Sequence, residues 1–131
     1  MAKKILVVDD EPDLLKVVTF RLRKLGYDII EATDGQKAMD LIQEHRPHLI
    51  LLDLRLPIMD GREVCRRVKA DDQLKHIPIF FITASSGAVN LEMTKELKAE
   101  GFLVKPFEPE ELLEIVEKLI GSDEQKNPYS A

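Results

Sequence analysis

The apolar residues of this 131-residue chain form two alternating kinds of segment. Segments of the first kind are short, continuous apolar runs, which are typical of strands that are covered on both faces. These runs are Ile5–Val8, Tyr27–Ala32, Leu49–Leu52, Ile77–Ile82 and Phe102–Val104. Segments of the second kind follow each run and repeat apolar residues every three or four positions, which predicts amphipathic helices.

Four of the five predicted helices have a clear apolar period. Its members are Leu15, Val18, Leu22 and Leu25 in the first helix, Ala38, Leu41 and Ile42 in the second, Val64 and Val68 in the third, and Leu112, Leu113, Val116, Leu119 and Ile120 in the last. Gly26 and Gly121 follow the first and the last helix, where glycine commonly ends a helix, and Pro109 fits a first turn. The other segment, SSGAVNLEMTKELKAEG, has the weakest start because glycine, valine and asparagine are poor helix formers.

Strands that alternate with helices predict an α/β fold, with a parallel sheet, right-handed crossovers and helices on both faces. The ligand site of such a sheet lies beyond the carboxyl ends of its strands. Polar side chains at those ends are therefore the first candidates for function. They are Asp9, Asp10 and Glu11 after the first run, Asp53 after the third, Thr83 after the fourth, and Lys105 after the fifth.

Carboxylates dominate this set, and three of them meet if the first and third strands are neighbours. Two carboxylates about 4 Å apart repel each other by roughly 4 kcal/mol at an effective dielectric constant near 20. Lys105 offsets only part of that repulsion, whereas a divalent cation resolves it, and Mg²⁺ suits a site with few carboxylates. The set therefore predicts a Mg²⁺ site in which Asp53 attacks phosphorus while Thr83 and Lys105 hold the phosphoryl oxygens.

The acids after the first run also have a simpler explanation, because negative charge complements the dipole of the helix that follows. For Glu11 this helix-start explanation remains the better one. For Asp9 and Asp10 it is weaker, because Asp53 and Lys105 are predicted to lie at the same edge of the sheet.

Composition narrows the classes of function. The net charge of −5 gives no sign of binding to nucleic acid or to an anionic membrane, and no apolar run is long enough for a signal peptide or a membrane span. The single cysteine, Cys65, excludes an internal disulfide and favours a reducing, cytoplasmic location. Its place on the third helix predicts a small buried apolar residue.

Four segments in order, ILVVDDEP, LILLDLRLPIMDG, IFFITA and FLVKPF, carry a resemblance to a known family. Together, at these intervals, they resemble the receiver domain of the response regulators of two-component signalling, close in layout to the single-domain chemotaxis regulators. The resemblance covers residues 3–121 and leaves 122–131 as a polar tail or the start of a linker. It implies a single-domain, doubly wound (βα)5 flavodoxin-like three-layer sandwich, with a five-stranded parallel sheet in the order 2-1-3-4-5.

The resemblance also implies which residues hold the metal and the phosphoryl group. Asp53 would be the phosphoacceptor, and Asp10, Asp53 and the backbone carbonyl of Arg55 would ligate Mg²⁺. Asp9 would act mainly through a metal-bound water. Arg55 and Ser85 would flank the path of the hydrolytic water, and we expect the bulky Arg55 to shield the phosphoryl group and to slow its loss.

A second set of residues would change its position when the domain is phosphorylated. Thr83 would bond the phosphoryl group and move towards it, and Lys105 would pair with it. Phe102 stands where the family commonly has a switch tyrosine, so switching by packing survives but recognition through a hydroxyl does not. The peptide bond before Pro106 would be cis.

The function implied is a phosphorylation-dependent signalling switch. A phosphohistidine on a sensor histidine kinase or on a phosphotransfer protein would supply the phosphoryl group, and the surface around the fourth helix, fifth strand and fifth helix would control a downstream protein or output domain. The domain would catalyse only its own phosphorylation and dephosphorylation, and would bind neither nucleic acid nor membrane directly. Two questions stay open: whether an output domain follows Ala131, and whether phosphorylation produces a homodimer.

Three other functions are compatible with parts of the pattern. A haloacid-dehalogenase-type phosphohydrolase needs a second aspartate two residues after the nucleophile, where this chain has Arg55. A flavodoxin-like electron carrier needs a phosphate-binding loop after the first strand, and DDEPD would repel a phosphate. A pseudo-receiver that binds partners without taking phosphate remains the alternative, although divergence of that kind normally damages the acid pair, the acceptor or the lysine.

Overall fold

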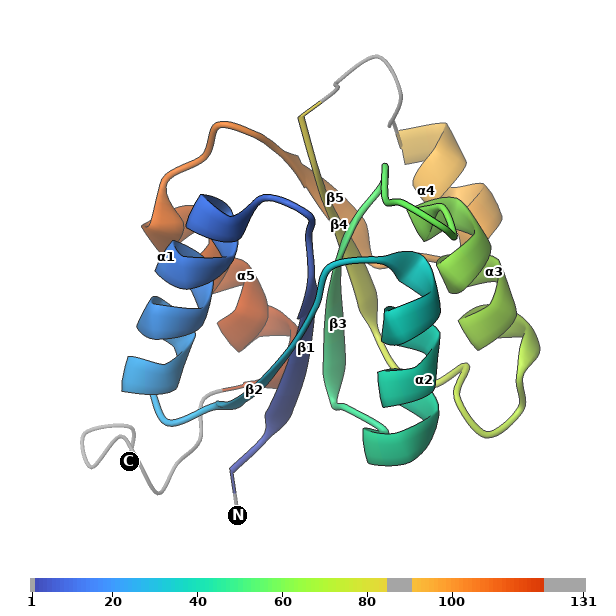
Figure 1. The fold of residues 1–131 in the computed structure, drawn as a ribbon, viewed down its shortest axis with the longest axis horizontal. Helices are drawn as coiled ribbons and strands as arrows, with labels where there is room; N and C mark the ends of the chain where they lie inside the picture. Colours follow the sequence, from blue (N-terminus) through green and yellow to red (C-terminus); the bar gives the residue numbers. More distant parts are fainter. Residues whose placement is uncertain (1, 85–90, 122–131) are drawn as a thin grey trace.

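The computed structural model describes residues 2–84 and 91–121, which form one layer of strands between two layers of helices (Figure 1). Strands and helices alternate along the described chain, as the apolar pattern predicts. In order they are β1 (Lys4–Val8), α1 (Pro12–Lys24), β2 (Asp28–Ala32), α2 (Gly35–His45), β3 (Leu49–Asp53), α3 (Gly61–Ala70), β4 (Ile79–Thr83), α4 (Leu91–Leu97), β5 (Gly101–Val104) and α5 (Pro109–Ile120).

The sheet has the order β2-β1-β3-β4-β5, and each pair of neighbouring strands is parallel. This confirms the doubly wound flavodoxin-like fold that the sequence predicts. Val8 is paired with Leu52, so that Asp9 and Asp53 come next along their strands. Thr83 is paired with Val104, which brings Lys105 to the same level. The register therefore gathers the polar ends of four strands at one edge, which we call the carboxyl edge.

Each face of the sheet has its own apolar core. Helices α1 and α5 cover one face, and α2, α3 and α4 cover the other (Figure 1). All five residues of β3 and of β4 are buried, which explains why these segments are apolar rather than alternating. Cys65 is buried beside α4, where its Sγ lies 3.4 Å from the carbonyl oxygen of Leu97, so the prediction of a buried residue is confirmed.

Some predicted boundaries are wrong by one or two residues. Tyr27 precedes β2, because its N–H bonds to the carbonyl of Leu22 and so completes the turn after α1. β4 begins at Ile79 rather than Ile77, since Ile77 bonds back to Leu74 in a turn and Pro78 has no N–H. Leu25, predicted to belong to the apolar face of the first helix, is an exposed C-cap residue instead.

The predicted helix ends and the proline positions agree with the structure. Gly26 and Gly121 have positive φ angles after α1 and α5, and Pro109 lies in the first turn of α5. The Lys105–Pro106 peptide bond is cis, the isomer that the resemblance implies. α4 is described from Leu91 onwards, and the weak start predicted for it falls on residues 85–90, outside the described part. Within the described ranges, the helices are all too short or too polar to cross a membrane.

Candidate functional site

Three aspartates meet at the carboxyl edge, as the order of the strands requires. Asp9 follows β1 directly and is fully buried, Asp53 is the last residue of β3 and is almost as buried, and Asp10 is exposed. One carboxylate oxygen from each lies within 4.8 Å of those of the other two. The structure thus brings together the three carboxylates that the sequence singles out.

Lys105 supplies the positive charge at the centre of this cluster. Its side chain is only 10% exposed, and its Nζ lies 2.8 Å from Asp9 Oδ2, 2.8 Å from Glu11 Oε1 and 3.3 Å from Asp53 Oδ2. The backbone helps to place it, because the Lys105 N–H donates to the carbonyl of Thr83 at 2.7 Å. A single ammonium group therefore contacts three carboxylates.

The contact of Lys105 with Glu11 was missed by sequence reasoning, which gave Glu11 the role of starting a helix. Glu11 does occupy the N-cap position of α1, but its side chain makes no capping hydrogen bond and accepts one from Lys105 instead. The turn after β1 explains this, because the Glu11 N–H donates to Asp9 Oδ1 at 2.9 Å and holds the residue at the edge. The only signal in the sequence was the position of Glu11 directly after two site acids.

The cluster keeps more negative than positive charge, and its pKa values reflect this. Burial, followed by the charge of Asp9, raises the pKa of Asp53 to about 6, against the opposing effect of Lys105. Burial also raises the pKa of Asp9. Burial alone would lower the pKa of Lys105, but hydrogen bonds and charge from Asp9, Glu11 and Asp53 raise it overall, so this lysine stays charged.

The donor set fits a small divalent cation. Asp9 Oδ2 is buried, and among the described residues it has no hydrogen-bond partner beyond its 2.8 Å ion pair with Lys105 Nζ. That oxygen, together with those of Asp10 and Asp53, makes a set of hard anionic ligands of the kind that Mg²⁺ prefers. A divalent cation would relieve the repulsion that the single lysine leaves.

The remaining candidate residues border the same cluster. Thr83, which is buried, ends β4, and the exposed Arg55 lies beside the acceptor, with its N–H 3.4 Å from Asp53 Oδ1. Phe102 is half-buried, pairs with Phe81 across β4 and β5, and packs against the core on the α2–α4 side. Ser85 falls outside the described residues. The roles that the resemblance gives to these residues remain predictions.

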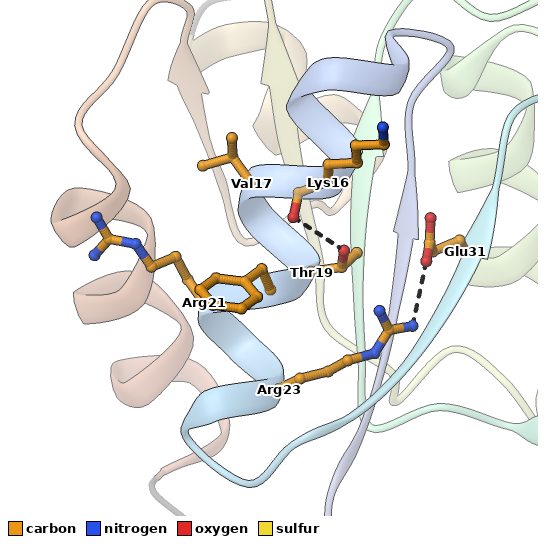
Figure 2. A pocket seen from close by; sticks show the side chains of 7 residues that line it. Lys16, Val17, Thr19, Arg21, Arg23 and Glu31 are labelled. Atoms are coloured by element: carbon orange, nitrogen blue, oxygen red, sulfur yellow. Dashed lines mark hydrogen bonds and ion pairs between the residues drawn. The ribbon is translucent and has the colours of Figure 1, made fainter.

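The cluster opens into a cavity of about 270 Å³, which is not the largest hollow in the molecule. Its lining residues are Asp10, Glu11, Asp53, Arg55, Thr83 and Ala84. A larger cavity of about 630 Å³ lies along α1 and contains none of these site residues, as Figure 2 shows. We place the chemistry in the smaller cavity, because that one is lined by Asp53, whose pKa is raised.

A glycine fixes the backbone that carries the acceptor. The Gly61 N–H donates to the carbonyl of Leu54 at 2.8 Å, so that α3 begins directly against the end of β3. A Cβ atom at Gly61 would clash with the carbonyl oxygen of Asp53. The close approach of α3 to the site therefore requires glycine at this position.

The family model of the response regulator receiver domain matches residues 5–117. The chain belongs to this family. Receiver domains are modules of two-component signalling, so the resemblance carried by the four sequence segments is confirmed. The boundaries 3–121 that we predict for the domain are close to the matched range and remain a prediction.

Solved receiver domains from several bacteria are similar along their whole length. The chemotaxis response regulator CheY4 of Vibrio cholerae is 33% identical, with 91% of this chain and 99% of that one covered and a TM-score of 0.84. The receiver domain of sensor histidine kinase PA1611 from Pseudomonas aeruginosa is 33% identical, with 93% and 100% covered and a TM-score of 0.83. The PA1611 structure holds a magnesium ion in its active site cleft.

A third structure, that of a response regulator from Chloroflexus aurantiacus, is 30% identical, with 92% of this chain and 98% of that one covered and a TM-score of 0.83. These receivers belong both to separate regulators and to a histidine kinase. The family therefore fixes the fold and the signalling class of this chain but not the protein in which such a domain works.

Proposed function

We propose that this receiver domain is a phosphorylation-dependent switch in which Asp53 accepts a phosphoryl group from a phosphohistidine of a sensor histidine kinase or a phosphotransfer protein. The observation that supports this most strongly is a buried carboxylate, with a pKa raised to about 6, in contact with a lysine that stays charged. Acids and bases with shifted pKa values in a cavity are typical of functional sites.

The transfer needs Asp53 in its ionised form. With a pKa of about 6, most of the carboxylate is ionised at neutral pH and can act as a nucleophile. A carboxylate oxygen forms the new bond to phosphorus, the bond from phosphorus to the imidazole nitrogen breaks, and its electron pair returns to that nitrogen. The product is an acyl phosphate on Asp53.

The neighbouring residues supply charge and hydrogen bonds for the phosphoryl oxygens. Lys105 is already in contact with Asp53 Oδ2, and Thr83 lines the same cavity. Asp9, Asp10 and Asp53, with the backbone carbonyl of Arg55, would hold Mg²⁺, which supplies positive charge to the phosphoryl oxygens when bound. The domain acts only on itself in this proposal: it catalyses its own phosphorylation and dephosphorylation.

Phosphorylation would be communicated through Thr83 and Phe102 to the surface of α4, β5 and α5. Backbone bonding supports such coupling, because the carbonyl of Thr83 holds the N–H of Lys105 at the end of β5. Phe102 is only half-buried and lies three residues before that lysine, so we expect a shift of Thr83 to change how deeply its ring packs. A downstream protein or an output domain would read this surface.

A protein phosphodonor would also need a surface beside the carboxyl edge, and α1 offers one. The helix starts directly after Glu11 and exposes apolar side chains, with Phe20 60% and Val17 47% exposed. Lys24 covers part of the Phe20 ring, with its Nζ 5.3 Å from the centroid. Exposed apolar patches of this kind commonly mark protein contacts, and we assign this one to the phosphodonor.

The stability of the acyl phosphate would depend on access of water to it. Arg55 is exposed, borders the site cavity and carries a long side chain, so we expect it to shield the phosphoryl group. Arg55→Asn should therefore shorten the lifetime of the phosphorylated form. A lifetime that is unchanged or longer would contradict this role.

The phosphoacceptor can be tested with a small phosphodonor. Incubation of the chain with acetyl phosphate and Mg²⁺, followed by intact mass spectrometry, should show one added phosphoryl group, and Asp53→Asn should show none. Asp72→Asn, a change of an exposed acid at the other end of the sheet, is the matched control and should be phosphorylated like the wild type. Absence of phosphate on the wild type would favour the pseudo-receiver that binds partners without phosphorylation.

A further inference from the structure

A third cavity lies at the opposite end of the sheet from the acid cluster, and we call it the amino-edge pocket. Its volume is about 500 Å³. The residues that line it come from the start of β1, the α2–β3 and α3–β4 connections and the end of α5: Lys3, Arg46, Pro47, His48, His76, Ile77, Pro78, Leu119 and Ile120. The amino-edge pocket shares no residue with the cavity at the carboxyl edge.

The charge of the pocket is opposite to that of the chain. The nine lining residues include one lysine, one arginine, two histidines and no acid, whereas the whole chain has 24 acidic and 19 basic residues. In a chain of net charge −5, a cavity whose charged and titratable lining residues are all bases is a local reversal of the surface field. The pocket therefore favours an anionic ligand.

The polar groups of the pocket are held in place by the surrounding backbone and side chains. Arg46 Nη2 donates to Gln73 Oε1 at 2.9 Å, which fixes the guanidinium while leaving it further N–H groups. The Lys4 N–H donates to His48 Nδ1 at 2.9 Å, so the neutral ring carries its proton on Nε2 and can donate it to a ligand. These donors need little rearrangement to meet an anion.

The rest of the pocket is apolar. Ile77 and Pro47 are buried, and Pro78, Leu119 and Ile120 are half-buried, so the wall between the bases offers no further charge. Cavities of roughly 300–1,000 Å³ with apolar walls and a few convergent polar groups are typical of small-molecule sites. An inorganic ion would contact only the bases, whereas an organic anion would also contact these walls.

We propose that the amino-edge pocket binds a small organic anion: a carboxylate, or a phosphate-like group, attached to an aromatic or short aliphatic group. The anionic group pairs with the Arg46 guanidinium, which suits planar oxyanions, and with His48 Nε2–H. The apolar group lies against Pro78 and Leu119, which are half-buried. This site is independent of the function proposed for Asp53.

Occupation of the pocket would act on the end of the last helix. Lys3 Nζ donates to the carbonyl of Ile120, and the Tyr27 hydroxyl donates to the carbonyl of Gly121 at 2.8 Å, so the end of α5 is tied to β1 and to the start of β2. A ligand in contact with Leu119 and Ile120 stabilises this junction, beyond which residues 122–131 follow. The pocket is thus placed to couple ligand binding to the position of the end of α5.

Nuclear magnetic resonance with four probes tests the chemistry of the site. The ¹⁵N-labelled full chain in magnesium-free buffer is titrated with benzoate, phenylphosphonate, benzyl alcohol and inorganic phosphate. Benzoate and phenylphosphonate should give saturable shifts of the amides of His48, Ile77 and Leu119. Benzyl alcohol lacks the charge and inorganic phosphate lacks the apolar group, so each should bind at least about tenfold more weakly.

Matched arginine variants test the assignment. Arg46→Gln should weaken benzoate binding about tenfold, whereas Arg23→Gln, which alters the cavity along α1, should leave it within about twofold. His76→Gln, a change of an exposed residue in a connection, should weaken it about threefold and serves if Arg46→Gln does not fold. No saturable shifts, equal binding of benzyl alcohol and benzoate, or equal effects of Arg46→Gln and Arg23→Gln would overturn the proposal.

Discussion

Two nearly buried lysines, one at each end of the sheet, show how differently the two edges are built. The Lys105 side chain is 10% exposed and contacts three carboxylates at the carboxyl edge. The Lys69 side chain, at the end of α3, is 9% exposed and contacts one carboxylate, that of Glu100. It also donates to the backbone carbonyls of Lys75 and Ile77.

The difference lies in what balances each charge. Around Lys69 the charges balance one to one, and the Glu100 carboxylate is further satisfied by the Ile79 N–H at 2.6 Å. Around Lys105 negative charge is in excess, because one ammonium group contacts three carboxylates, and the pKa of Asp53 is raised. A balanced pair suits a structural role, whereas an unbalanced cluster is stable only where a cation or a transferred group completes it.

Exchanging the two lysines for methionine should separate the two roles most sharply. Lys105→Met should lower the rate of phosphorylation by acetyl phosphate about 100-fold or more, because the ammonium group that contacts Asp53 is lost. Lys69→Met should change that rate less than about twofold, since Lys69 touches no site residue. Rates from intact mass spectrometry at saturating Mg²⁺ decide this. If both variants were slowed equally, the comparison between the lysines would be wrong.

Removing the acceptor charge should stabilise the protein. In the folded state the pKa of Asp53 is raised from 3.8 to about 6, so the stability it contributes is fully present below pH 3.8 and is lost as the pH rises through about 6. Asp53→Asn, which cannot ionise, should increase the free energy of unfolding by about 3 kcal/mol at pH 8 without Mg²⁺ and by little at pH 4.

Urea unfolding at the two pH values measures this effect. Asp72→Asn is the control, because this acid is exposed near the amino edge and forms an ion pair with Lys75. In the control, the difference between pH 8 and pH 4 should match that of the wild type. Equal stability of Asp53→Asn and the wild type at pH 8 would show that folding does not raise the pKa of Asp53.

The two edges also differ in how far the sequence predicts them. The carboxyl edge was predictable in its main residues, because parallel strands bring their ends together wherever the motifs fall, and so Asp9, Asp53 and Lys105 had to meet. The contact between Lys105 and Glu11 was not predictable, because the local sequence at a helix start does not determine the direction in which an acidic side chain points. Helix capping and ion pairing explain the same residue equally well until the fold is known.

The amino-edge pocket could not be predicted at all. Its bases come from the residue before β1 and from two connections, and they belong to no recognisable motif, so that only the three-dimensional packing brings Lys3, Arg46 and His76 to one cavity. The interiors of the strands were the most predictable part, because a sheet covered on both faces requires continuous apolar runs. The first residues of the strands were less predictable, because turns such as the one that contains Ile77 and Pro78 are also apolar.

Lys69 should matter for stability in proportion to what it satisfies. Lys69→Met removes hydrogen bonds to the carbonyls of Lys75 and Ile77 and leaves Glu100 without its cation, so we expect a loss of about 1–2 kcal/mol in the free energy of unfolding. Lys75→Met, which breaks only an exposed pair with Asp72, should cost less than about 0.5 kcal/mol. Urea unfolding of both variants compares them, and similar losses would remove the distinction between the buried and the exposed lysine.

Magnesium should stabilise one edge and not the other. At tenfold excess over its dissociation constant, Mg²⁺ should raise the free energy of unfolding by about 1.4 kcal/mol, because it relieves the repulsion among Asp9, Asp10 and Asp53. Asp10→Asn should lose most of this gain, while Arg46→Gln at the amino edge should keep all of it. NaCl at equal ionic strength controls for screening. If Arg46→Gln lost the gain as well, the added cation would be acting on the overall charge of the chain rather than on the acid cluster.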